Sequence, residues 1–258
     1  MRRRLAAVAI LALALGGCGG TERSLPTPSP VPGGTGSPSI SHSPVPTSPP
    51  GPTAAPSRPI PPAWATPIEG DVPPEDLDVT SLVPAEADPT SRVVLPAAGG
   101  VADQVAVAYV VGADPFAAEH GFAIWQRFDE PPAWSVVYAF VDAIAAGVLG
   151  IDVQSGDLTG DGHAETLTFE ETGGSGACGR WRVVLTSLED TRQVWSRRTC
   201  DTTATIADGA LQVREAIFGP EDPHCCPGAF RTTTLTWEGG SFVETGVEES
   251  PGSPRPPG

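Results

Sequence analysis

The sequence contains no lysine, and its 15 basic residues stand against 31 aspartates and glutamates, which gives a formal net charge of −16. Nucleic acids and anionic lipid headgroups are bound through clustered cations that neutralise several phosphates at once. A chain with so few cations cannot supply such a surface. We therefore exclude a nucleic-acid-binding role.

Motifs for catalysis are also missing. The sequence has no G-x-S-x-G elbow, no zinc-protease helix and no glycine-rich phosphate loop. Of its four histidines, only His120 and His224 lie where a general base could act, because His42 is in a proline-rich stretch and His163 in an acidic loop. We predict that the chain is not an enzyme, with a hydrolase of envelope polymers as the third alternative.

The N-terminus carries an export signal. Three arginines precede the apolar run Leu5 to Leu15, which is short for a mature transmembrane helix, and small residues follow it. The sequence Leu-Gly-Gly-Cys at residues 15–18 resembles a bacterial lipobox. This resemblance implies a signal peptide at residues 1–17, a lipid on Cys18 and a location on the extracytoplasmic face of the cell membrane.

A long stretch after Cys18 is poor in large apolar groups. Residues 24–75 contain 17 prolines, and only Arg23 and Arg58 carry charge between Glu22 and Glu69. Such a segment cannot bury enough apolar surface to offset its chain entropy. We predict a disordered tether over residues 18–74, a folded domain over residues 75–247 and a disordered tail over residues 248–258.

The predicted domain is all-β. Short runs rich in valine, threonine and aromatic residues alternate with glycine, aspartate and proline, as in antiparallel sheets. A helix is conceivable only at Asp142 to Leu149. The expected strands are 104–111, 122–128, 134–141, 165–169, 181–186, 193–197, 211–213, 231–237 and 241–244.

An internal repeat orders these strands. Residues 102–107 align with residues 164–169, and each segment is followed by a strand-turn-strand unit; a third, shorter unit begins at Asp208. The alternative is that any all-β chain gives such matches. We predict three meander units arranged as blades, either a partial propeller or stacked sheets.

The acidic loop 156–165 is the chemically specific motif of the second unit. Oxygen-bearing side chains recur at alternate positions, and Gly162 permits a sharp turn, which is the pattern of a cage for Ca²⁺. An EF-hand is excluded, because its twelfth position would be Thr168 in a strand. The alternative is a polar turn without metal. The candidate ligands are the side chains of Asp157, Thr159, Asp161 and Glu165 and the carbonyl of His163.

The pattern D-x-T-x-D-G-x-x-E before a strand resembles the calcium loops of FG-GAP and VCBS repeats. Thr159 stands where those loops usually have asparagine or aspartate. The resemblance implies a structural Ca²⁺ bound by this loop.

Four cysteines remain in the domain, and an oxidising compartment favours disulfides among them. Cys178 precedes one strand of a predicted hairpin and Cys200 follows the other, so this pair is geometrically favoured. It would leave Cys225 and Cys226 as a vicinal pair. The alternative joins both hairpin cysteines to Cys225 and Cys226. A soft-metal site at His224-Cys225-Cys226 lacks a converging partner.

The segment Asp222-Pro-His-Cys-Cys-Pro227, with the later Trp237-Glu-Gly-Gly240 hairpin, resembles the C-terminal part of LppP/LprE-type bacterial lipoproteins. That resemblance implies an envelope address and carries no defined activity. We predict a lipid-anchored surface protein with a non-catalytic binding or envelope role toward an unknown ligand. The alternative is a purely structural envelope component. An exposed row of tryptophans would favour binding, although we expect these side chains to pack in the core.

Overall fold

The computed structural model describes residues 62–114, 117–142, 147–173, 177–187, 190–220, 222 and 226–252. These residues form β-strands and two short 3-10 helices, η1 (Pro74–Asp76) and η2 (Val79–Leu82), and no α-helix. The prediction of an all-β domain is therefore confirmed. The strands are β1 (Ile68–Glu69), β2 (Ala87–Leu95), β3 (Gln104–Val111), β4 (Glu119–Asp129), β5 (Pro132–Asp142), β6 (Gly150–Gly156), β7 (Glu165–Gly173), β8 (Cys178–Thr186), β9 (Thr191–Thr199), β10 (Thr202–Ala207), β11 (Ala210–Ile217), β12 (Ala229–Glu238) and β13 (Ser241–Pro251).

The strands form three antiparallel meanders that follow one another along the chain. The first sheet has the order β1-β5-β4-β3-β2, the middle sheet β6-β7-β8-β9 and the third sheet β10-β11-β12-β13. Three successive meander units were predicted, and they are confirmed. The two segments aligned as a repeat, residues 102–107 and 164–169, lead into β3 and β7, the second strands of their meanders.

The sequence prediction missed the first strand of every meander. All nine expected strands match observed ones, but β2, β6 and β10 were not expected, and neither was the two-residue strand β1. Half-buried and exposed residues predominate in β2, β6 and β10, which contain few large apolar groups. Their conformation therefore depends on the ladder formed with the following strand rather than on their own composition.

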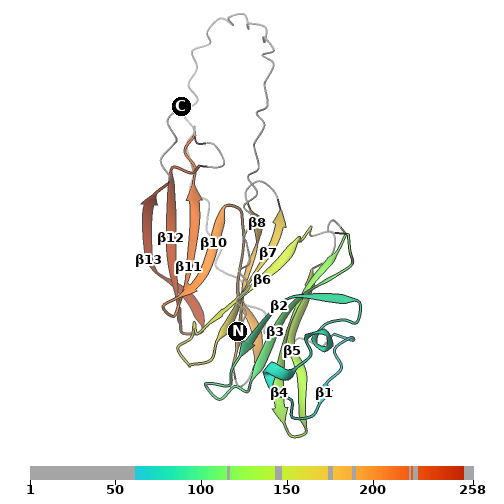
Figure 1. The fold of residues 1–258 in the computed structure, drawn as a ribbon. Helices are drawn as coiled ribbons and strands as arrows, with labels where there is room; N and C mark the ends of the chain where they lie inside the picture. Colours follow the sequence, from blue (N-terminus) through green and yellow to red (C-terminus); the bar gives the residue numbers. More distant parts are fainter. Residues whose placement is uncertain are drawn as a thin grey trace, which may run out of the picture. The chain divides into compact units, whose positions relative to one another are not determined.

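The middle sheet lies between the other two (Figure 1). One apolar cluster joins Phe122 and Ile124 of the first sheet to Ile151 and Val184 of the middle sheet. A second cluster joins the opposite face of the middle sheet, including Leu167, Trp181 and Val183, to the third sheet; its members there are Ala204, Leu211 and Val213. The middle sheet is thus packed on both faces, so the polar residues on it are covered as well.

The outer face of the first sheet is covered by the chain that precedes β2. Trp64, Leu77 and Leu82 pack there against a core that includes Trp125 and Trp134. The indole of Trp125 donates to the carbonyl oxygen of Leu82 at 2.9 Å. The indole of Trp134 donates likewise to the carbonyl of Val72 at 2.9 Å. Packed structure therefore includes residues 62–74, upstream of the expected domain start at residue 75.

The outer face of the third sheet is polar, which lets the series of sheets end there. Leu211 and Val213 point toward the middle sheet. Gln212 and Arg214 alternate with them and pair in register with Thr234 and Thr232, none of which is buried. At the other end, β13 continues to Pro251 and so includes residues 248–251, which were assigned to the loose tail.

The remaining sequence predictions about local structure fall partly outside the described residues. The possible helix at 142–149 begins with Asp142 at the end of β5, residues 143–146 are not described, and residues 147–149 are not helical.

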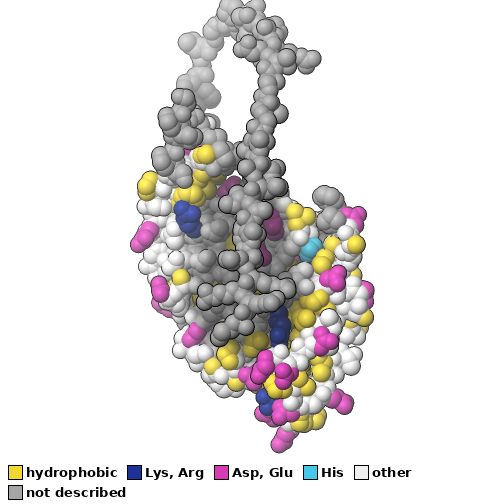
Figure 2. Space-filling view, viewed as in Figure 1, with side chains coloured by type: hydrophobic (Ala, Val, Ile, Leu, Met, Phe, Trp, Pro, Cys, Tyr) yellow, Lys and Arg dark blue, Asp and Glu magenta, His cyan; other side chains and the backbone are white. Residues whose placement is uncertain are grey.

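On the face shown in Figure 2, acidic side chains are scattered and basic ones are few, in line with the net charge of −16.

Candidate functional sites: an acidic loop and an intersheet pocket

The predicted calcium loop connects β6 to β7, at the start of the second strand of the middle sheet. Gly160 and Gly162 have φ angles of +77° and +88°, a region that side-chain-bearing residues rarely adopt. Gly99, in the β2–β3 connection, approaches the loop so closely that an added Cβ would lie 2.9 Å from the carbonyl oxygen of Asp161. The loop is therefore packed against the first sheet.

The loop carboxylates accept hydrogen bonds from the loop's own backbone. Asp157 accepts from the amides of Gly160 at 2.7 Å and Gly162 at 2.9 Å. Asp161 accepts from the amide of His163 at 2.8 Å. These bonds fix the turn and leave each carboxylate oxygen with a further lone pair.

Glu165 and His163 are buried behind this turn. Glu165 is 1 % exposed and accepts from the amide of Leu158 at 2.7 Å, while the Thr159 hydroxyl lies 3.5 Å from its other oxygen. Burial, with smaller contributions from Asp161 and Asp157, raises the pKa of Glu165 to about 7. The imidazole of His163 is fully buried, its Nε2 is 3.3 Å from the side-chain oxygen of Gln104, and desolvation lowers its pKa.

The structure brings the predicted acidic ligands into one neighbourhood without closing a metal cage. Asp157, Asp161 and Glu165 interact electrostatically, and no described basic side chain forms an ion pair with any of them. Among the described residues, however, no three His, Cys, Asp or Glu side chains converge in a group that could hold a metal ion. The donor set has the hard-oxygen chemistry that suits Ca²⁺, and its carboxylates would have to turn toward the ion.

A second site lies between the first and middle sheets, where sequence reasoning expected nothing. It is a pocket of about 370 Å³ at the end of β5, lined by parts of β7, β8 and β9. Its charged lining residues are Asp142, Glu170, Arg180 and Arg198. Along β7, Thr168 and Glu170 alternate with the apolar Leu167 and so share the other face of the strand. This pattern by itself indicates a solvated face, and the first sheet covers it.

The two acids of this pocket are held by Arg182. The side chain of Glu170 is 2 % exposed, and Arg182 donates to both of its carboxylate oxygens. Arg182 also donates to Asp142 at 3.3 Å and lies over the ring of Phe140, 4.4 Å from its centroid. Burial raises the pKa of Glu170, the hydrogen bond from Arg182 lowers it, and the neighbouring Asp142 carboxyl raises it.

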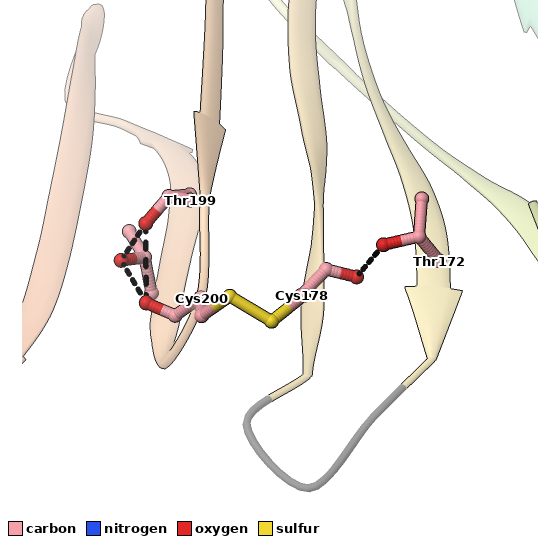
Figure 3. The surroundings of a disulfide bond; sticks show 5 residues. Thr172, Cys178, Thr199 and Cys200 are labelled. Carbon is pink, nitrogen blue, oxygen red and sulfur yellow. Dashed lines mark hydrogen bonds between the residues drawn. A yellow bond between two sulfur atoms is a disulfide. The ribbon is translucent and has the colours of Figure 1, made fainter. Parts of the chain in front are cut away.

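A disulfide closes the edge of the pocket. Cys178 at the start of β8 is bonded to Cys200, just after β9, and both residues line the pocket (Figure 3). The Thr172 hydroxyl donates to the Cys178 carbonyl at 3.0 Å. The favoured pairing is thus confirmed. Cys226 is half-buried, and Cys225 and His224 lie outside the described residues, as does Cys18.

The tryptophans do not form an exposed row. Trp125, Trp134 and Trp181 are buried, and Trp195 and Trp237 are half-buried. Phe169 stacks on Trp181 with ring centroids 4.4 Å apart. These side chains pack in or beside the core, as predicted.

His120, one of the two possible general bases, is buried near the pocket. It pairs in register with Asp142 across β4 and β5, and its Nδ1 has no hydrogen-bond partner among the described residues. Desolvation lowers its pKa, and the charge of Asp142 acts in the opposite direction.

Comparison of the chain with protein-family models, with curated proteins and with solved structures found no match. No helix in the described part of the chain is long and apolar enough to span a lipid bilayer. The functional argument therefore rests on the two sites themselves.

Proposed function

We propose that this chain is a lipid-anchored protein of the extracytoplasmic cell surface whose β domain binds a ligand without catalysis. The observation that carries the proposal is the intersheet pocket, because it combines a volume of about 370 Å³ with charged groups of both signs. Buried or half-buried charges cost free energy, and a purely structural interface is usually built from apolar groups. Their presence beside an open volume favours recognition.

The address rests on residues 1–18. The arginine-rich start, the apolar run and the Leu-Gly-Gly-Cys sequence support lipid attachment at Cys18, and the proline-rich stretch supports an extended tether. A long tether places a module away from the membrane without providing chemistry. It suits a domain that contacts envelope components at a distance.

The loop between β6 and β7 supports a structural Ca²⁺ within the same proposal. Three carboxylates share one neighbourhood, and no described arginine forms an ion pair with them, so a divalent cation would neutralise their charge. Asp157, Asp161 and Glu165 would hold the ion together with the Thr159 hydroxyl and the His163 carbonyl. The ion would stabilise the connection between the first and middle sheets.

Binding at the pocket is tested by filling it. The purified full-length chain carrying Cys18→Ser, which cannot be retained through the lipid, is titrated against isolated cell envelopes. Its saturable retention is compared with that of the same chain carrying Thr172→Trp, whose side chain would occupy the pocket. Thr245→Trp, on an exposed residue of β13, is the matched control. We expect Thr172→Trp to raise the Kd for the envelopes at least about ten-fold, which is a loss of about 1.4 kcal/mol in binding free energy. The control should keep the wild-type Kd.

Two outcomes would count against the proposal. Retention that does not saturate, or that Thr172→Trp leaves intact, would favour the purely structural envelope role.

Lipid attachment is tested separately by incorporation of a labelled fatty acid, which Cys18→Ser should abolish. Labelling that survives this substitution would overturn the lipid anchor.

A further inference from the structure

Arg180 and Arg198 lie directly opposite each other on neighbouring strands. They are register partners in the β8–β9 ladder, so their side chains leave the same face of the middle sheet. Both line the intersheet pocket. Like charges in directly opposed positions of a sheet are destabilising, so this arrangement needs a compensating anion.

The acids of the pocket compensate this pair only in part. Arg180 approaches Glu170 at 3.6 Å and Asp142 at 3.9 Å, distances beyond a hydrogen bond. Arg198 is exposed at the rim of the pocket and forms no hydrogen bond or ion pair with any residue that the structure describes. The negative charge of Glu170 is taken up by Arg182, which donates to both of its oxygens. The guanidinium donors of Arg180 and Arg198 are therefore available.

The β8–β9 ladder sets the spacing of the two arginines, and the disulfide links the strand ends beside them. Arg180 follows Cys178 by two residues and Arg198 precedes Cys200 by two, so the bond lies at the end of the same pair of strands (Figure 3). Groups held in place before binding lose less conformational entropy when a ligand arrives. The strand positions that carry the two side chains are thus fixed before a ligand arrives.

We propose that Arg180 and Arg198 bind a carboxylate group of the ligand, an inference that rests on the proposed binding function. Guanidinium groups pair with planar oxyanions through two parallel N–H donors. A carboxylate is favoured over a phosphate, because Asp142 and Glu170 line the same pocket and would repel a dianion more strongly than a monoanion. The ligand class is therefore a carboxylate-bearing envelope molecule.

The test uses acetate as the probe on the full-length chain, followed by NMR at constant ionic strength. We expect saturable shifts of backbone amides around Gly179 and Thr199 with Kd on the order of 1 to 10 mM, as befits so small an anion. Arg198→Gln should weaken acetate binding about ten-fold. Arg197→Gln is the matched control, because Arg197 is the adjacent residue but pairs with Glu215 of the third sheet.

Inorganic phosphate and the thermal midpoint complete the design. Phosphate at neutral pH should bind more weakly than acetate, and Arg198→Gln should melt at the same or a higher temperature because it relieves a like-charge pair. Absence of saturable shifts, phosphate binding more tightly than acetate, or equal losses in both arginine variants would each overturn the carboxylate site. Envelope retention that Thr172→Trp abolishes while Arg198→Gln spares would leave the binding function standing and reject this inference alone.

Discussion

The acidic loop between β6 and β7 and the intersheet pocket hold their carboxylates in opposite ways. In the loop, Asp157 and Asp161 accept hydrogen bonds from backbone amides two to five residues away. Glu165 is buried with no basic partner among the described residues. In the pocket, Glu170 receives two donors from Arg182 on the neighbouring strand. The carboxylates of the loop accept hydrogen bonds from amides close in sequence and have no arginine partner among the described residues. The carboxylates of the pocket are bound by an arginine from another strand, and two further arginines line the pocket.

This difference predicts which site needs which ion. A cluster of unpaired carboxylates is completed by a cation, and an opposed pair of arginines is completed by an anion. Both sites lie on the middle sheet, the loop at the start of β7 and the pocket at the start of β8 and the end of β9. This difference can be tested by removing Arg182, the internal cation of the pocket, or by adding Ca²⁺, the external cation proposed for the loop.

The largest effect is expected from removing the internal cation. Arg182→Met should leave the buried carboxylate of Glu170 without its partner and lower the free energy of unfolding by about 3 to 5 kcal/mol. Urea unfolding measures this change. Arg192→Met is the control, because Arg192 pairs with Asp190 at a more exposed site and should cost less than about 1 kcal/mol.

A second substitution sharpens this result. Combining Arg182→Met with Glu170→Gln removes the unpaired charge, so the double variant should recover a substantial part of the loss. Additive losses in the double variant would show that Arg182 stabilises the fold by packing on Phe140 rather than by neutralising Glu170.

Addition of the external cation should have the next largest effect. Extracellular calcium modules often have Kd values of roughly 0.1 to 1 mM, so Ca²⁺ at 100 times Kd should stabilise the full chain by about 2.7 kcal/mol relative to chelator. Asp161→Ala should abolish this increment. Asp152→Ala, on the exposed face of the adjacent strand β6, should preserve it. A thermal midpoint that is the same in calcium and in chelator would make the loop a polar turn.

The smallest expected effect is the loss of stability that His120 causes when the pH is lowered. Burial lowers the pKa of His120 in the folded protein below its value of about 6.5 in the unfolded chain. The unfolded state therefore binds the proton more readily, and this stability is complete above pH 6.5 and lost as the pH falls below it. Between pH 7.5 and 5.5 the loss from His120 is at most about 1.4 kcal/mol.

Comparing wild type with His120→Gln by chemical denaturation at both pH values isolates this contribution. The variant should lose less stability on acidification, and the remaining loss belongs to other groups, among them His163 of the loop. An identical loss in both proteins would mean that the environment of His120 near Asp142 does not disfavour its charged form.

The sequence was informative wherever the cause of structure is local. Nine strands, the three meanders, the Cys178–Cys200 pair and the core role of the tryptophans could all be predicted, because alternation, turn residues and hairpin geometry act over a few residues. The strands β2, β6 and β10 could not, since residues such as Asp88, Pro89 and Ser155 give them little strand preference of their own.

The candidate sites divide along the same line. The sequence by itself determined the acidic loop, because its oxygen donors are spaced within nine residues and glycines allow the turn. Only the tertiary structure decided that Glu170 is buried, that Arg182 and Asp142 meet it, and that Arg180 and Arg198 face one pocket. An alternating polar face looks the same in sequence whether water or another sheet covers it, and the packing of the first sheet on the middle one makes that difference.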